Sequence, residues 1–118
     1  MKPLTRAEEQ VMKVLWNLNQ AFLKDIIEQM PEPKPHANTV ATILKILIEK
    51  EYVAYEAFSR VHRYYPLVSR EAYSKRSLNT LVGSYFSGSY KDAVSFLVQE
   101  KELSVKDLEL LLKQLKKK

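Results

Sequence analysis

One short segment of the chain carries polar, cationic and small side chains that suit contacts with DNA. Amides, hydroxyls and ammonium groups can bind phosphates and base edges, and an alanine can meet the methyl group of a thymine. These residues are Asn38, Thr39, Ala41, Thr42 and Lys45. The same segment holds an apolar stripe at helical spacing, formed by Val40, Ile43, Leu44, Leu47 and Ile48. The pattern predicts a helix from Thr39 to about Lys50, with Asn38 as its N-cap, whose polar face is offered to the major groove.

A second group of residues is basic. It comprises Arg60, His62 and Arg63. The group lies at the junction of two runs rich in aromatic and β-branched residues, 52–58 and 63–67, which predict the strands of a hairpin. At the tip of such a hairpin, long cationic side chains could reach the phosphates beside the groove. For either group considered alone, an exposed helix face or a solvated turn is the more frequent explanation.

The order of the predicted elements favours DNA recognition over that explanation. Thr5 and Glu8 form a capping-box pattern that opens a helix ending near 17–19, and the apolar segment 21–23 predicts a short strand. A second helix, over about 25–30, ends at a series of prolines. Helix, short strand, helix, helix and hairpin is the order of a winged helix-turn-helix, whose third helix enters the major groove.

The second half of the chain is predicted to be helical, with breaks at 87–89 and before a capping pattern of Ser104 and Asp107. The fold class is therefore mainly α (α+β), with a winged helix-turn-helix and small antiparallel sheet over 1–68 and a helical dimerisation domain over 69–118. The helices predicted over 69–118 carry apolar stripes but are too few and too short to form a sizeable core by themselves. A second subunit would bury the stripes. The residues predicted at that interface are Leu81, Tyr85, Leu97, Leu108, Leu111, Leu112 and Leu115.

The composition excludes several other classes of function. The 118 residues contain no cysteine, so no disulfide, thiolate metal site or cysteine nucleophile can form. No apolar run reaches about 18 residues and the N-terminus has no signal-peptide core, which predicts a cytoplasmic protein without membrane insertion. We see no catalytic constellation, and expect no enzyme, cofactor or metal. The net charge is +5, of which residues 69–118 carry +4, so bulk charge does not identify a DNA-binding surface.

Several segments resemble the penicillinase repressor family of the BlaI/MecI/CopY type. They are residues 4–8, 11–16, 25–29 and 38–44, the wing pattern of Arg60, Tyr64 and 66–69, and the C-terminal 103–108. The similarity spans nearly the whole chain. It implies a homodimeric transcriptional repressor whose winged helix binds the half-sites of a palindromic operator in double-stranded DNA. It also implies that the C-terminal helices interleave with those of the second subunit.

The chain departs from this family at the positions that concern signalling and DNA contact. Relatives of the β-lactam systems are inactivated by proteolysis, which implies a membrane sensor or protease as a partner. The matching region here is Ser95, Phe96 and Leu97, without the Asn-Phe pair that is cut in those relatives. Copper-responsive relatives use cysteines, which this chain lacks. Ile46 and Glu51 stand where many relatives carry a basic residue and a helix-ending glycine.

A protein-interaction module is the competing class of function. Winged helices also bind proteins through the third helix and the hairpin, and the apolar Ile46 on a polar helix face supports this alternative. Salt separates the two classes, because binding through several phosphates weakens steeply as ionic strength rises and an apolar contact does not. A regulator triggered by a small ligand is a third alternative, for which the sequence shows no convergent polar pocket.

Overall fold

The computed structural model describes residues 2–116, and the chain divides into two compact units, Met1–Tyr73 and Ser74–Lys118. The predicted domains, 1–68 and 69–118, include residues 1, 117 and 118, which lie outside the described range. Their predicted boundary stays a prediction. Helices make up most of the described chain and the strands form one small antiparallel sheet, which confirms the predicted fold class.

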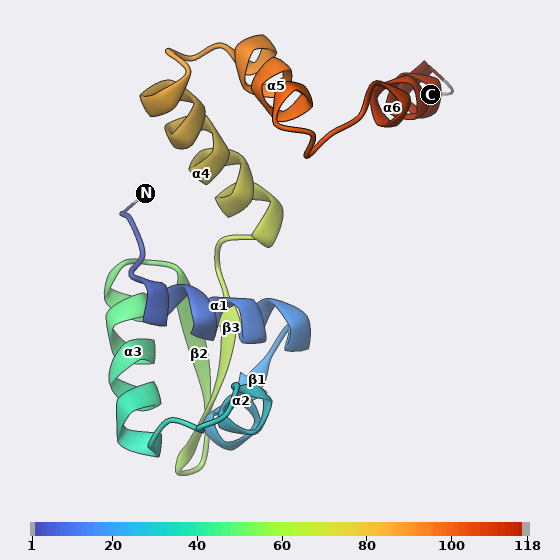
Figure 1. Cartoon of the computed structure of the whole chain (residues 1–118). Coiled ribbons are helices and arrows are strands. Elements are labelled where there is room, and N and C mark those ends of the chain that lie inside the picture. Colours follow the sequence, from blue (N-terminus) through green and yellow to red (C-terminus); the bar gives the residue numbers. More distant parts are fainter. Residues whose placement is uncertain (1, 117–118) are drawn as a thin grey trace. The chain divides into compact units, whose positions relative to one another are not determined.

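The first unit is a winged helix-turn-helix (Figure 1). Its elements are α1 (Arg6–Leu18), β1 (Ala21–Phe22), α2 (Leu23–Gln29), α3 (Ala37–Glu49), β2 (Val53–Phe58) and β3 (Val61–Pro66), followed by the first residues of α4 (Arg70–Tyr85). The sheet order is β1-β3-β2, with both neighbours antiparallel to the central β3. Tyr64 on β3 accordingly pairs with Ala21 on one side and with Tyr55 on the other. The β2–β3 hairpin extends away from the three helices and forms the wing.

The start of α1 follows the capping-box prediction. The Thr5 hydroxyl accepts a hydrogen bond from the Glu8 amide at 3.2 Å, and the Glu8 carboxylate accepts one from the Thr5 amide at 3.0 Å. The helix closes at Asn19, whose φ of 68° lies in the left-handed region that asparagine tolerates better than most residues. Its amide bonds to the Leu15 carbonyl at 2.8 Å.

Apolar residues at helical spacing build the core of the first unit. The fully buried ones are Val11, Met12, Leu15, Ile26, Val40, Leu44, Leu47, Tyr52 and Val53. The predicted stripe of α3 is confirmed, because three of its five members are in this set and Ile43 and Ile48 pack against it. Burial of the stripe determines the rotation of α3, so that Thr42 and Lys45 on the opposite face are exposed.

Two predicted details next to the residues that are predicted to contact DNA are wrong. The N-cap of α3 is His36 rather than Asn38: the His36 Nδ1 accepts the Asn38 amide at 3.2 Å, and the helix begins at Ala37. The hairpin turn is also shorter than expected, since β3 already begins at Val61. A φ of 57° at Ser59 provides the left-handed residue that a two-residue turn requires. His62 and Arg63 therefore lie on β3 and not at the tip.

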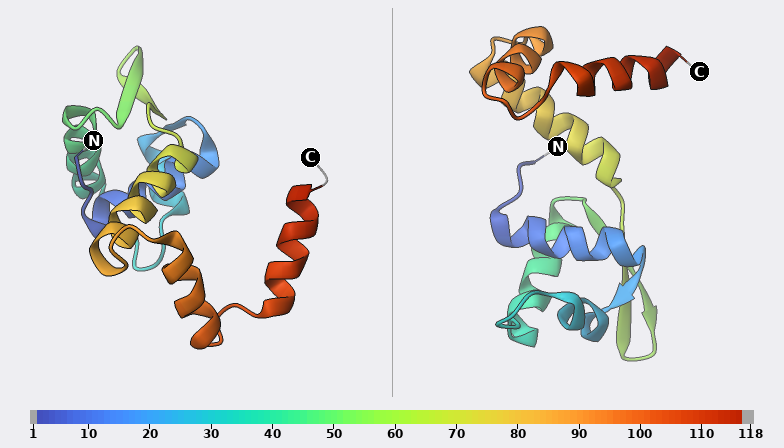
Figure 2. Two further views of the ribbon diagram at one scale, coloured as in Figure 1. Left: turned by 90° about the horizontal axis from the view of Figure 1, so that it is seen from above. Right: turned by 45° about the vertical axis from the view of Figure 1, so that its right-hand side comes forward.

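The second unit comprises the remainder of α4 together with α5 (Tyr90–Gln99) and α6 (Val105–Lys116), shown in two further views in Figure 2. The predicted Ser104 and Asp107 capping pattern is confirmed by reciprocal hydrogen bonds of 3.1 and 3.0 Å. The bond from the Ser104 amide lowers the pKa of Asp107. None of the described residues of α5 or α6 is buried, so the apolar side chains of these helices are not enclosed within the single chain. Within residues 2–116, no helix is long and apolar enough to span a membrane.

Candidate nucleic-acid interface

The residues predicted to contact DNA from α3 lie mostly on one exposed face. Asn38, Thr42 and Lys45 recur at i, i+4 and i+7 and are all exposed. Thr39 lies to one side of this line, where it borders a hollow of about 290 Å³ shared by α1, the proline segment and α3. Ala41 is half-buried on the other side. The structure therefore brings three of the five residues together and places two at the edges of the face.

The hydroxyl of Thr42 already donates a hydrogen bond inside the helix. Thr42 Oγ1 lies 2.9 Å from the carbonyl oxygen of Asn38, the common back-bond of threonine in helices. Its oxygen can still accept a hydrogen bond and its methyl group can contact an apolar base edge. Thr42 is consequently suited to accept hydrogen bonds from DNA rather than to donate them.

Glu49, which was not among the predicted contact residues, extends the same line of α3 residues. It stands at i+11 from Asn38 and is exposed. Its carboxylate repels phosphates, whereas the amides of the first turn of α3 carry the partial positive charge of a helix N-terminus. Helical periodicity alone would have located Glu49. The N-terminal half of α3 is therefore the half that suits an approach to DNA.

The three basic residues of the wing have different surroundings. Arg60 is exposed at the turn. Arg63, on β3, places its guanidinium 3.3 Å from a carboxylate oxygen of Glu56 and 4.7 Å from the ring centroid of Phe58. The ring of His62 stacks on Tyr55 with a centroid separation of 4.1 Å. Cross-strand neighbours thus hold Arg63 and His62 on the sheet, and Arg60 extends from the tip.

The N-terminal half of α3 and the tip of the wing lie at the same end of the first unit. Figure 1 and the right-hand view of Figure 2 show the N-terminal end of α3 and the β2–β3 turn projecting in the same direction. A duplex placed across this end would meet both, which is the arrangement that a third helix in the groove and a wing on the backbone require.

The residues predicted to contact a second subunit are largely exposed. Tyr85 exposes 77% of its surface, and Leu108 is half-buried. Leu81, Leu97, Leu111, Leu112 and Leu115 are exposed by 40–55%. The predicted cleavage region, Ser95, Phe96 and Leu97, is one part of α5, and the Phe96 ring lies 5.5 Å from that of Phe86.

A helix-turn-helix with an exposed polar third helix and a wing defines a winged-helix DNA-binding protein. The profile of the family described as Penicillinase repressor matches residues 4–117. The chain belongs to this family of transcriptional repressors. The expectation that it is not an enzyme is confirmed by its relatives, which are repressors.

Individual relatives match nearly the whole chain. The methicillin resistance regulatory protein MecI of Staphylococcus aureus is 24% identical over 116 residues, which cover 98% of this chain and 94% of the relative. MecI of Mammaliicoccus sciuri is 23% identical with the same coverage. A solved structure described as the CopR repressor is 35% identical with a TM-score of 0.48, and the match covers 58% of this chain and 100% of that one.

Proposed function

We propose that the protein is a homodimeric transcriptional repressor that binds a palindromic operator. The N-terminal half of α3 would lie in the major groove, with Asn38, Thr42 and Lys45 toward base edges and phosphates. Arg60 would contact the backbone beside the groove. The observation that carries the proposal is that the N-terminal end of α3 and the tip of the wing lie at one end of the first unit. The remaining predicted contacts, Thr39, Ala41, His62 and Arg63, would lie at the margins of this surface.

The second unit supports a homodimer. The stripe on α6 runs through Leu108, Leu111, Leu112 and Leu115 at i, i+3, i+4 and i+7. A contiguous apolar surface of this kind marks a place that another chain covers. A two-fold copy of the same chain would bury it and would relate the two α3 helices by the symmetry of a palindrome.

Titration of a selected DNA fragment with variants of α3 tests the DNA contact. Thr42→Ala should weaken binding to the best sequence by about 1 kcal/mol or more while leaving binding to random DNA nearly unchanged. Lys45→Ala should weaken both and lower the slope of log affinity against log salt by about 1 for each subunit. Lys13→Ala, which removes an exposed charge from α1, is the matched control and should bind like the wild type. A DNA affinity that does not depend on salt and is unchanged by Thr42→Ala and by Lys45→Ala would favour the protein-interaction alternative.

We also propose that an upstream signal releases the repressor, and the resemblance to its family suggests a membrane sensor or protease as the partner. The region 95–97 is helical, and proteases cut a segment after it has opened. Cleavage there therefore requires local unfolding of α5, which has no buried residue to hold it in the single chain. Hydrogen exchange as slow in α5 as in α3 would argue against this route.

A further inference from the structure

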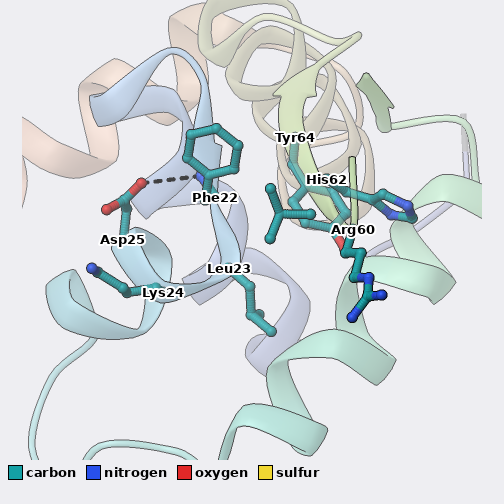
Figure 3. A pocket seen from close by; sticks show the side chains of 8 residues that line it. Phe22, Leu23, Lys24, Asp25, Arg60, His62 and Tyr64 are labelled. Carbon is teal, nitrogen blue, oxygen red and sulfur yellow. Dashed lines mark hydrogen bonds between the residues drawn. The ribbon is translucent and has the colours of Figure 1, made fainter. Parts of the chain in front are cut away.

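A hollow of about 560 Å³ opens beside the wing at the point where β1 leads into α2 (Figure 3). Its volume falls in the range of roughly 300–1,000 Å³ in which proteins bind small molecules. The hollow follows from the shortness of β1, which pairs only with Arg63 and Tyr64 of β3. Beyond Arg63, β3 continues to the turn without β1 beside it, and the hollow lies in that position.

The wall of the hollow is largely apolar. It is formed by Phe22 at the end of β1, by Leu23 at the start of α2, and by Val61 and Tyr64 from β3. Phe22, Leu23 and Tyr64 are half-buried, and Val61 exposes 54% of its surface. A flat hydrocarbon group placed here would cover apolar surface that water now contacts, which is favourable.

The rim of the hollow is basic. Lys24, Arg60 and His62 are exposed residues of its lining. Figure 3 shows Arg60 and His62 on the wing side of the hollow and Lys24 on α2, with its side chain directed away from the wing. The one carboxylate among the lining residues belongs to Asp25, and its Oδ2 accepts the Phe22 amide at 3.2 Å. That bond satisfies one oxygen of the carboxylate and holds it at the start of α2.

The phenol of Tyr64 adds a neutral donor to this rim. Burial, and to a smaller extent the neighbouring Tyr55, raises the pKa of Tyr64 above its ordinary value of 10.0. Tyr64 therefore keeps its proton at neutral pH and places no negative charge beside Lys24 and Arg60. An anion entering the hollow would meet positive charge and hydrogen-bond donors.

We propose that this hollow binds a small organic anion with a flat apolar body, of the class of aromatic carboxylates. The ring would lie against Leu23 and Val61, and the carboxylate would face Arg60 on the wing side of the hollow. Because Arg60 is also the wing residue assigned to the DNA backbone, an anion bound there competes with phosphate and weakens operator binding. The competition rests on the proposed function, whereas the site rests on the hollow and its charges.

Binding is tested on the full chain with a set of probes that share one shape. Backbone-amide NMR spectra are recorded during titration with 1-naphthoate, with 1-naphthalenemethanol and with 1-naphthylmethylamine. The carboxylate should shift amides of 22–25 and 60–64 and bind about two- to fivefold more tightly than the alcohol, as expected for one exposed ion pair. The amine should bind more weakly than the alcohol. Equal binding of all three, or shifts confined to α5 and α6, would overturn the site.

Inorganic phosphate distinguishes this site from a plain patch of positive charge. It carries the charge but no apolar body, so it should bind far more weakly than 1-naphthoate. If phosphate shifts the same amides with equal affinity, the hollow is a phosphate contact of the DNA interface and the proposal is wrong.

Two substitutions locate the ligand within the hollow. Val61→Glu places a carboxylate on an exposed position of the wall and should reduce the affinity for 1-naphthoate about two- to fivefold. Lys45→Ala is the matched control, since it removes a DNA-facing charge that does not line the hollow and should leave 1-naphthoate binding unchanged. The thermal midpoint of each variant reports whether it is folded. A folded Val61→Glu that binds like the wild type contradicts the placement.

The competition has its own measurement. With 1-naphthoate at ten times its dissociation constant, the apparent dissociation constant for DNA should rise by about elevenfold for each subunit in which the two exclude each other, or by about 120-fold for a dimer that binds through both wings. The Val61→Glu chain, compared with its own value in the absence of the ligand, should respond much less. A ligand that occupies the hollow without changing DNA affinity overturns the competition. Failure of the free chain to bind any DNA would instead refute the proposed function, and the NMR result would stand separately.

Discussion

The ammonium group of Lys50 lies 2.6 Å from a carboxylate oxygen of Glu8 and joins the C-terminal end of α3 to the first turn of α1. The same oxygen accepts the Thr5 amide, and Lys50 also donates to the Pro3 carbonyl at 3.0 Å. Glu8 exposes only 5% of its surface and is the one buried charged residue in the described part of the chain. The pair therefore fixes the beginning of α1 against the end of α3, the helix whose residues are proposed to contact DNA.

This pair predicts how stability depends on pH. Burial by itself would raise the pKa of Glu8, but the hydrogen bonds from Lys50 and from the Thr5 amide outweigh it, and the pKa lies below its ordinary value of 4.5. A carboxyl with a lowered pKa contributes stability that is complete above its unfolded pKa and is lost as the pH falls through its folded value. The wild type should therefore lose stability below about pH 4.5.

Glu8→Gln separates this effect from the titration of other groups. At neutral pH it should lower the free energy of unfolding by about 1–3 kcal/mol, because Lys50 keeps its charge and loses its partner. The difference between the two forms should shrink as the pH falls below 4.5 and through the lowered pKa of Glu8, since the wild-type carboxyl then becomes protonated as well. Urea denaturation of both proteins across this range is the measurement. A difference that does not change with pH would show that the charge of Glu8 contributes nothing.

A second prediction concerns the residue after α3. Glu51 has a φ of 68°, and the Tyr52 and Glu51 amides bond to the carbonyls of Leu47 and Ile48 at 2.9 and 3.0 Å, which is a Schellman motif. Glycine reaches this conformation without the steric cost that a side chain incurs. Glu51→Gly should stabilise the fold by about 0.5–1 kcal/mol.

The control for that substitution is Glu51→Ala, which removes the same charge but keeps the Cβ atom. It should leave stability nearly unchanged or lower it slightly. Thermal unfolding of the two variants compares them directly. If alanine stabilises as much as glycine, then the charge of Glu51 and not its backbone conformation is responsible.

The parts of the fold that follow from nearby residues could be predicted from the sequence. The capping box of Thr5 and Glu8, the stripe of α3 and the order of the elements depend on residues within a few turns of one another. The N-cap of α3 was missed because Asn38 is the better capping residue in general, although His36 caps in fact. Trp16 packs against Tyr73, with 5.6 Å between the ring centroids. Its hydrogen bond to the Val68 carbonyl at 2.8 Å joins distant parts of the chain and leaves no local pattern.

The candidate interface was predictable to the same extent. The exposure of Thr42 and Lys45 follows from helical periodicity, and the structure agrees. The surroundings of Arg63 depend on which residue of β2 lies opposite it. The sequence predicts a longer hairpin turn than the structure has, and an error in turn length changes the strand register. The hollow beside Phe22 depends on where β1 stops pairing with β3, which the apolar segment alone does not specify.

The wing provides a prediction that distinguishes two arginines. Arg60 is exposed at the tip, whereas the guanidinium of Arg63 is engaged by Glu56 and lies over Phe58. Arg60→Ala should reduce the slope of log affinity against log salt by about 1 for each subunit and weaken specific and random DNA by similar factors. Arg63→Ala should change the slope less and lower the thermal midpoint more, because it loses contacts within the sheet. Titrations at four salt concentrations test both, and a larger slope change for Arg63→Ala would reverse this assignment.

The last prediction tests the dimer with two leucines of α6 that are equally exposed in the single chain. Leu112 exposes 54% and Leu110 exposes 53% of its surface, but Leu112 lies on the stripe with Leu108 and Leu115, and Leu110 lies on the opposite side of the helix. In a monomer, changing either one to aspartate would have the same small effect. In the proposed dimer, Leu112→Asp buries an unpaired charge at a cost of about 3–5 kcal/mol, which raises the dimer dissociation constant by more than about a hundredfold.

Light scattering over a range of protein concentrations measures this difference. The wild type and Leu110→Asp should remain dimers at concentrations where Leu112→Asp has dissociated into monomers. The double change Leu108→Asp with Leu112→Asp should remove the dimer entirely, while far-ultraviolet circular dichroism confirms that the first unit stays folded. Dimers that persist in the double variant would place the interface elsewhere. If the Leu110 and Leu112 variants dissociate equally, a charge on either side of α6 disrupts the dimer, and the stripe face is not the specific interface.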